Sequence, residues 1–125
     1  MSKIKEWALA IQEFEGFFTP SWRNWRGSIS WRQNNPGNLR WSPFQLGTRD
    51  GFAYFKDYQA GFDALCYQLR LAALGKSRVY KSTDTLAVFF SRYAPTEDSN
   101  NPDVYAKFVA KKLGVPVSTK ISTLL

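Results

Sequence analysis

The apolar residues near the start of the chain have the spacing of one face of a helix. They recur at i, i+3, i+4 and i+7, and they are Ile4, Trp7, Ala8, Ile11, Phe14 and Phe18. The pattern predicts a helix from about residue 2 or 3 to residue 17, which Ser2 can cap and Gly16 can close.

Three more segments carry a helical pattern, two of them between a capping residue and a stopping glycine. They are residues 58–74 between Asp57 and Gly75, residues from about 82 or 83 to 93–95, and residues 102–113 between Asn101 and Gly114. The chain is therefore expected to be mainly helical.

Residues 19–50 show no helical period and are rich in Pro, Gly, Ser, Asn, Trp and Arg. So long an irregular stretch in a compact domain is usually functional. Residues 51–55 read as a short strand, expected to form a small hairpin with residues near 39–41. The prediction is a mainly α (α+β) fold with an irregular lobe that carries minor β-structure. The 125 residues, 44% of them hydrophobic, suit a single domain over residues 1–125.

Glu15 lies inside the apolar stripe of the first predicted helix, whereas Glu6 and Glu13 fall on the opposite face. A carboxylate on a buried face costs free energy unless it is paired or neutral, and desolvation raises its pKa. Cleavage of a glycosidic bond needs such an acid, still protonated near neutrality. The alternative is a solvated acid at the helix end, or an acid paired with a basic residue.

The composition removes several kinds of catalytic site. The chain has no histidine, which excludes Ser-His-Asp triads and Cys-His dyads and speaks against a catalytic zinc site. The single cysteine, Cys66, lies in an apolar helical pattern and is interpreted as a core residue. Any catalysis is expected to rest on carboxylates, amides and hydroxyls, with no cofactor and no metal.

The net charge of +7 favours polyanionic partners, either nucleic acid or the anionic bacterial envelope. The basic residues are dispersed, and Lys111-Lys112 is the one adjacent pair. No apolar run approaches the roughly 20 residues of a membrane span, and the first residues have no signal-peptide core.

The strongest local signal is an amide-rich loop, residues 33–38. Asn35-Pro36-Gly37-Asn38 has the chemistry of a turn, because Pro fixes φ and Gly tolerates positive φ. Four side-chain amides lie within these six residues. Amides both donate and accept hydrogen bonds, which suits sugar hydroxyls and N-acetyl groups. The structural alternative is a loop whose amides bond its own backbone.

No acid other than Glu15 is an obvious catalytic carboxylate. The remaining candidates sit in turns or at helix starts, and they are Asp50, Asp57, Asp84, Glu97, Asp98 and Asp103. Tyr105, in the last predicted helix, is more often a core ring than a site residue, although its hydroxyl could orient a nearby carboxylate.

Several segments together resemble the ordered motifs of phage-type lytic transglycosylases, in the lysozyme-like superfamily near goose-type lysozymes. The segments are Phe14-Glu15-Gly16-Phe17, residues 33–39, residues 52–55, residues 61–65, Tyr93-Ala94-Pro95, and Tyr105 with residues 113–115. The resemblance spans about residues 4–115, and residues 34–39 are its most specific piece. The sequence departs from the motifs of that family at two places. Gly16 stands where many members of the family have Ser, and the amide-rich loop replaces their usual Gly-Leu-Met-Gln loop.

The resemblance implies one lysozyme-like catalytic domain with a groove between a helical lobe and an irregular lobe. It implies cleavage of the β-1,4 bond between N-acetylmuramic acid and N-acetylglucosamine, with Glu15 as the catalytic acid. The resemblance implies six residues for substrate binding, which are Gln33, Asn35, Asn38, Tyr54, Tyr93 and Tyr105. It also implies that Tyr105 hydrogen-bonds the catalytic acid.

In the implied mechanism Glu15 acts alone, first as acid and then as base, and gives a 1,6-anhydro product or, with water, plain hydrolysis. The expected partner is the peptidoglycan glycan strand, without nucleic acid or stable membrane insertion, and the protein is expected to be a monomer. We expect it to be made in the bacterial cytoplasm without a signal peptide, or carried with a virion, and to act on the cell wall. The alternatives are a non-catalytic peptidoglycan-binding or virion structural module and a basic nucleic-acid-binding domain.

Overall fold

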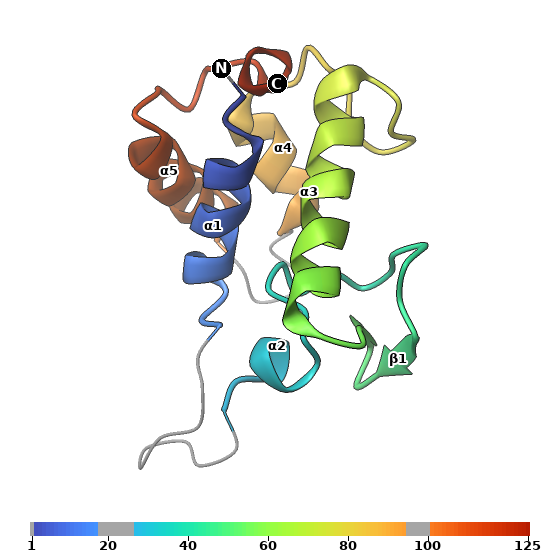
Figure 1. Ribbon diagram of the computed structural model, residues 1–125. Helices are drawn as coiled ribbons and strands as arrows, with labels where there is room; N and C mark the ends of the chain where they lie inside the picture. The colour runs from blue at the N-terminus through green and yellow to red at the C-terminus, as the bar shows by residue number, and fades with distance from the viewer. Residues whose placement is uncertain (1, 18–26, 95–100) are drawn as a thin grey trace. The chain divides into compact units, whose positions relative to one another are not determined.

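The computed structural model of the protein describes residues 2–17, 27–94 and 101–125. These ranges form five α-helices, two short strands and one 3-10 helix (Figure 1). The α-helices are α1 (Ile4–Phe14), α2 (Ile29–Arg32), α3 (Tyr58–Leu74), α4 (Leu86–Tyr93) and α5 (Pro102–Leu113). The strands are β1 (Gly47–Arg49) and β2 (Phe52–Tyr54), and the 3-10 helix is η2 (Ile121–Leu124). The prediction of a mainly helical fold with a minor β-hairpin is confirmed.

The chain divides into two compact units. The terminal unit contains Met1–Ala10 and Leu69–Leu125, and the central unit contains Ile11–Gln68. The boundaries fall inside α1 and α3, so each of these helices contributes residues to both units. The single catalytic domain over residues 1–125 stays a prediction.

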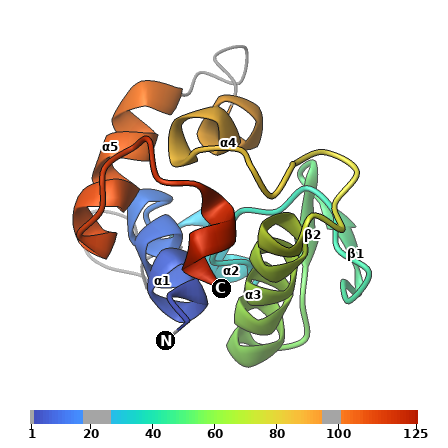
Figure 2. The ribbon, with the colours of Figure 1, turned by 90° about the horizontal axis from the view of Figure 1, so that it is seen from above.

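Aromatic rings dominate the core of the terminal unit. Trp7 of α1 meets Phe89 of α4 edge-on, with ring centroids 4.9 Å apart. Phe90 of α4 stacks on Tyr105 of α5 at 4.4 Å, and all four rings are fully buried. Such ring pairs stabilise a core beyond the area that they bury. They explain why α4 and α5 pack against each other (Figure 2).

In the central unit, β1 and β2 form an antiparallel hairpin in which Thr48 is opposite Ala53. The connection is Asp50-Gly51, whose φ angles of 55° and 81° are both positive. Positive φ at both positions is the signature of a type I′ turn, which matches the right-handed twist of paired strands. The predicted partner of the strand, residues 39–41, is therefore wrong. Leu39 gives β2 a single bond, from the Ala53 N–H to its carbonyl at 2.9 Å.

Helix bounds agree best where a cap and a glycine flank the pattern. The predictions for α3 and α5 are confirmed, with Asn101 capping α5 and Gly114 closing it at φ 70°. The prediction for α1 is three residues too long, because the helix ends at Phe14. The start predicted for α4 is too early, because Thr85 caps it by accepting from the Val88 N–H.

The irregular stretch contains a short helix that the sequence pattern did not predict. Ser28 caps α2 by accepting a hydrogen bond from the Trp31 N–H at 3.2 Å. This helix leads directly into the amide-rich loop, because the Asn35 N–H donates to the carbonyl of Ser30 at 2.8 Å. Among the described residues, no helix combines the length and apolar character that crossing a membrane requires.

Candidate active site around Glu15

Glu15 lies in the turn that closes α1. The Gly16 N–H donates to the Glu13 carbonyl at 3.2 Å, and the Phe17 N–H donates to the Gln12 carbonyl at 3.3 Å. This pair of bonds is a Schellman motif, which satisfies carbonyls that the end of a helix leaves unpaired. Glu15 therefore has a defined backbone position, and it is half-buried whereas Glu13 is exposed.

Gly16 has a φ of 72°, in the left-handed region. A side chain at this position would place its Cβ close to the following carbonyl, which costs about 1–2 kcal/mol. The motif therefore favours glycine here.

Tyr58, the first residue of α3, braces this turn. Its hydroxyl donates to Oε1 of Gln12 at 2.7 Å, and its ring lies 5.3 Å from the ring of Phe17. Burial raises the pKa of the Tyr58 hydroxyl, and the hydrogen bond to Gln12 opposes that rise in part. The hydroxyl consequently stays protonated near neutrality and remains a donor. No sequence pattern predicted a role for Tyr58 in the site.

Asn38 connects the amide-rich loop to the acid. Its Nδ2 donates to Oε1 of Glu15 at 3.4 Å, across 23 residues of sequence. Asn38 has a φ of 52°, so the left-handed backbone expected at Gly37 is found at Asn38 instead. The turn is closed by the Asn38 N–H, which donates to the carbonyl of Asn35 at 2.9 Å. Glu15 and Asn38 are therefore two predicted site residues that the structure brings together.

Asn35 is completely buried and bonds only backbone groups among the contacts that the structure describes. Its Nδ2 donates to the carbonyls of Leu39 and Ala53 at 2.8 and 2.9 Å, and its Oδ1 accepts from the Leu39 N–H at 2.9 Å. The bond to Ala53 ties the loop to β2, and the two bonds to Leu39 close the loop locally. The structural alternative for this amide is therefore observed, and a sugar contact by Asn35 stays a prediction.

Gln33 is also buried, and it holds the loop against the same strand. Its Nε2 donates to the carbonyl of Ala53 at 3.2 Å, and its own carbonyl accepts from the Phe55 N–H at 3.0 Å. Asn34, with φ 54°, donates its Nδ2 to the Phe55 carbonyl at 3.1 Å. The loop is thus built on β2 by both backbone and side-chain hydrogen bonds.

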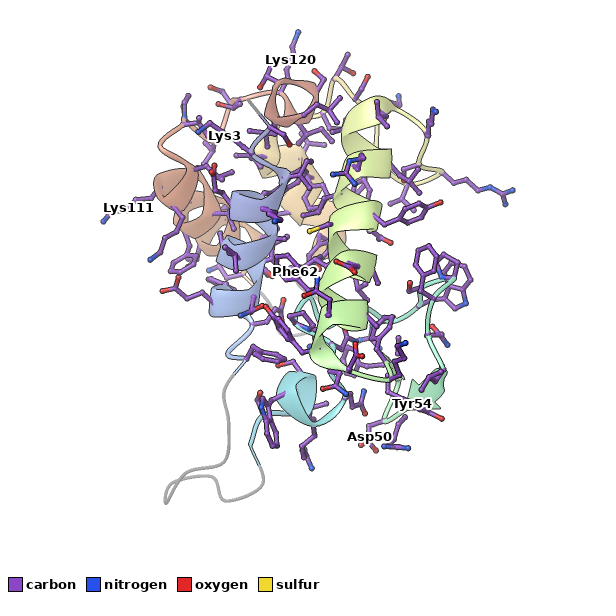
Figure 3. All side chains as sticks on the ribbon, in the orientation of Figure 1. Lys3, Asp50, Tyr54, Phe62, Lys111 and Lys120 are labelled. Carbon is purple, nitrogen blue, oxygen red and sulfur yellow. The ribbon has the colours of Figure 1, made fainter. Side chains whose placement is uncertain are left out.

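Tyr54 lies on β2 of the hairpin, whose tip carries Asp50 (Figure 3). The guanidinium of Arg49 lies 4.4 Å from the centroid of the Tyr54 ring, as in a cation–π pair. The opposite residue is Gly47, where an added Cβ would approach the Tyr54 hydroxyl to 2.8 Å. The ring is half-buried between these neighbours, and its predicted contact with substrate is untested.

Tyr93 and Tyr105 belong to the terminal unit, whereas Glu15 belongs to the central unit. Tyr105 is fully buried on Phe90, which agrees with the core-ring reading of this residue. Tyr93 is half-buried and stacks on Phe89 at 5.2 Å. The predicted contacts of Tyr105 with the acid and of Tyr93 with the cleft stay predictions.

The other acids of the central unit that the structure describes have different positions. Asp57 caps α3 by accepting from the Ala60 N–H at 2.8 Å, and Asp63 accepts from Gln59 at 2.7 Å. Asp50 is at the hairpin tip, and Glu97 and Asp98 lie outside the described residues. Within the described ranges no three acidic or thiol side chains cluster to form a metal site.

No protein-family model, curated protein or solved structure matches this chain. The resemblance to phage-type lytic transglycosylases therefore rests on the ordered motifs alone.

Gly61, in the first turns of α3, is a second residue whose role at the site was not predicted from the sequence. A methyl group there would overlap the carbonyl oxygen of Asn34 and lie 3.1 Å from Cδ of Pro36. The absence of a side chain lets α3 pass directly against the amide-rich loop. A glycine inside a strong helical pattern was the available signal, because glycine there is costly without a packing reason.

Proposed function

We propose that this protein cleaves peptidoglycan glycan strands at the β-1,4 bond between N-acetylmuramic acid and N-acetylglucosamine. Glu15 is the catalytic acid and then the base, and the product is the 1,6-anhydro sugar of a lytic transglycosylase. The proposal includes the groove between a helical lobe and an irregular lobe that a lysozyme-like fold would provide. The observation that carries it is a half-buried carboxyl, fixed at a helix end and hydrogen-bonded to an amide of a neighbouring loop.

The position of Glu15 supports a role as general acid. A partly desolvated carboxyl favours its neutral form, which is the form that donates a proton to the leaving oxygen. The Schellman turn and the Tyr58 brace restrict the backbone of Glu15, and catalytic groups are most effective when they are held in place.

Two side-chain carbonyl oxygens of the amide-rich loop are consistent with binding of a ligand that has many hydrogen-bond donors. Oε1 of Gln33 and Oδ1 of Asn38 are buried and have no hydrogen-bond partner among the residues that the structure describes. A buried acceptor without a partner costs about 1–3 kcal/mol. Sugar hydroxyls and the N–H of an N-acetyl group are donors that would satisfy such oxygens.

The mechanism needs a single carboxyl. Glu15 gives its proton to the glycosidic oxygen as the bond to the anomeric carbon breaks, and positive charge develops on the muramic ring. The 2-acetamido oxygen of that ring assists at the anomeric carbon. The Glu15 carboxylate then accepts the proton of the C6 hydroxyl as the C6 oxygen closes on the anomeric carbon.

A non-catalytic peptidoglycan-binding module is the second candidate, and exposed rings in the central unit favour it. Trp41 and Phe44 are 65% and 53% exposed, and Phe44 contacts Tyr67 of α3 edge-on at 5.0 Å. Flat aromatic faces in solvent are suited to stacking on sugars. The basic residues, in contrast, are dispersed along the sequence, and Lys111 of α5 and Lys120, which precedes η2, both point outward (Figure 3). This distribution does not favour a nucleic-acid-binding domain.

The test is digestion of purified sacculi by wild-type protein and by Glu15→Gln, which keeps the shape and removes the proton. We expect at least about a 100-fold loss of muropeptide release. Glu6→Gln is the matched control, because it makes the same substitution at an exposed site in α1, whose ion pair with Lys3 is 3.8 Å long. Near-wild-type release by Glu15→Gln would sink the assignment. Co-sedimentation of the wild type with sacculi and no released product would establish the binding module.

Mass spectrometry of the products separates the two reactions. The anhydro product is lighter by one water than the hydrolysed product, so its presence identifies the transglycosylase.

A further inference from the structure

The hydrogen bond between Asn38 and Glu15 distinguishes the two oxygens of the carboxyl. Nδ2 of an amide is a donor only, so Oε1 of Glu15 is an acceptor in this contact. A protonated carboxyl has one carbonyl oxygen and one hydroxyl oxygen. The carbonyl oxygen is the stronger acceptor of the two, so a donor at Oε1 favours the form with the proton on Oε2.

We infer that Asn38 is the positioning residue of the acid: it holds Oε1 of Glu15 as the accepting oxygen, so that Oε2 carries and delivers the proton. This inference rests on the proposed function. In the first step the Oε2–H bond breaks and the proton passes to the glycosidic oxygen, which takes the electron pair of the bond to the anomeric carbon. In the second step Oε2 accepts the proton of the C6 hydroxyl, and Glu15 returns to its starting form.

The same bond favours the charge that the first step creates. A hydrogen bond to an ionised acceptor is shorter and roughly twice as strong as one between neutral groups. The 3.4 Å contact is long for such a bond, as catalytic hydrogen bonds often are before substrate binds. Asn38 therefore stabilises the carboxylate more than the acid, which lowers the barrier to proton transfer.

The loop holds Asn38 in the position that this role requires. Its backbone has a φ of 52°, a conformation that Asn, Asp and Gly adopt more readily than other residues. Its N–H is bonded to Asn35, which is itself fully buried and anchored to β2. The amide of Asn38 is thus presented to Glu15 by a rigid support.

Several ionisable side chains in the described part of the central unit make contacts of their own. Glu13 is on the exposed face of α1, and Tyr58 of α3 donates to Gln12. The guanidinium of Arg40, which follows the loop, lies 4.7 Å from the centroid of the Phe52 ring. Removal of the Asn38 amide therefore tests its own bond to Oε1 of Glu15.

The experiment is a carbon NMR titration of the Glu15 carboxyl in the wild type, Asn38→Gly and Asn34→Gly. Glycine suits both positions, because Asn38 and Asn34 have φ angles of 52° and 54°. Loss of the donor in Asn38→Gly should raise the pKa of Glu15 by about 0.5–1 unit, since a bond to a charged group is worth about that much more than a neutral one. Asn34→Gly is the matched control, because its amide bonds the carbonyl of Phe55.

An unchanged pKa of Glu15 in Asn38→Gly would overturn the inference. An equal rise of this pKa in Asn38→Gly and Asn34→Gly would also overturn it, because it would indicate a general loosening of the loop. The alkaline limb of the pH–lysis profile should move upward in Asn38→Gly alone. The proposed function and the role of Asn38 can be refuted independently. If the wild type releases no muropeptides, the proposed function is refuted, and the titration still decides the role of Asn38. If lysis depends on Glu15 but its pKa does not shift in Asn38→Gly, the inference about Asn38 alone is refuted.

Discussion

The carbonyl oxygen of Asn34 occupies the space that a Cβ would fill at Gly61. Asn34 has a left-handed backbone, with φ 54°, and its side-chain amide donates to the carbonyl of Phe55. The start of α3 and the amide-rich loop are therefore in direct backbone contact. That contact fixes how closely the loop that carries Asn38 can lie to the helix.

Gly61→Ala tests this close approach through the sign of its effect. Helix propensity alone would make alanine more stable by about 1 kcal/mol. Overlap with the Asn34 carbonyl should outweigh that gain and destabilise the protein by about 1–3 kcal/mol, the usual range for overpacking. Urea denaturation followed by circular dichroism measures the difference. A more stable variant would contradict the contact.

Asn35→Leu should destabilise the protein strongly. The substitution keeps a similar shape and removes three buried hydrogen bonds. It leaves the Leu39 N–H unpaired, whereas the carbonyls of Leu39 and Ala53 each keep one donor, the Ala53 N–H and Nε2 of Gln33. A lost hydrogen bond costs about 1 kcal/mol and an unpaired buried group about 1–3 kcal/mol, so a total loss of at least about 3 kcal/mol is expected. Gln59→Ala serves as the control, because it removes an exposed bond to Asp63 and should change stability by about 0.5 kcal/mol or less. Unchanged stability of Asn35→Leu together with lost lysis would instead indicate direct sugar contact.

The stability of the terminal unit should fall in alkaline solution. Tyr80 is buried and stacks on Phe89 at 4.4 Å, and burial raises its pKa well above the ordinary value of 10.0, although the charge of Arg92 opposes this. Above pH 10 the tyrosine ionises in the unfolded chain and stays neutral in the folded one. The contribution of neutral Tyr80 to the free energy of unfolding is thus complete below pH 10, and it is lost as the pH rises toward the pKa of Tyr80 in the folded state.

Denaturation curves between pH 8 and pH 11 check this for the wild type, Tyr80→Phe and Tyr67→Phe. Tyr80→Phe keeps the ring stack and should show a flatter fall of unfolding free energy above pH 10. Tyr67, whose ring is 39% exposed, provides the comparison, and its phenylalanine variant should keep the wild-type slope. Identical slopes in all three proteins would show that Tyr80 does not contribute.

Local signals were sufficient to predict α3 and α5, because a cap, an apolar period and a glycine agree at each. The end of α1 was predicted too late for a reason that the sequence does contain. Gly16 was known to lie near the helix end, but its left-handed backbone closes the helix two residues before it. The predicted hairpin partner is wrong although the sequence contains Asp50-Gly51, a strong two-residue turn signal that sets the register of β1 and β2.

The composition of the candidate site was predictable in part, and its connections were not. Glu15 was found by its place on the apolar stripe and Asn38 by the density of amides around it. No local pattern predicts that these two meet, since 23 residues separate them and the contact depends on how the loop lies on β2. The different bonding partners of the amides also depend on tertiary structure. Asn35 and Asn38 have the same side chain, and their surroundings decide that one bonds the backbone and the other bonds Glu15.

The amide-rich loop also has a consequence for how the protein behaves at high concentration. An open strand edge presents free N–H and C=O groups that another chain can pair with, which leads to aggregation. Both backbone groups of Ala53 on the side of β2 away from β1 are already bonded, to Leu39 and to the amide of Asn35. The loop that holds Asn38 against Glu15 therefore also prevents neighbouring molecules from extending the sheet on that side.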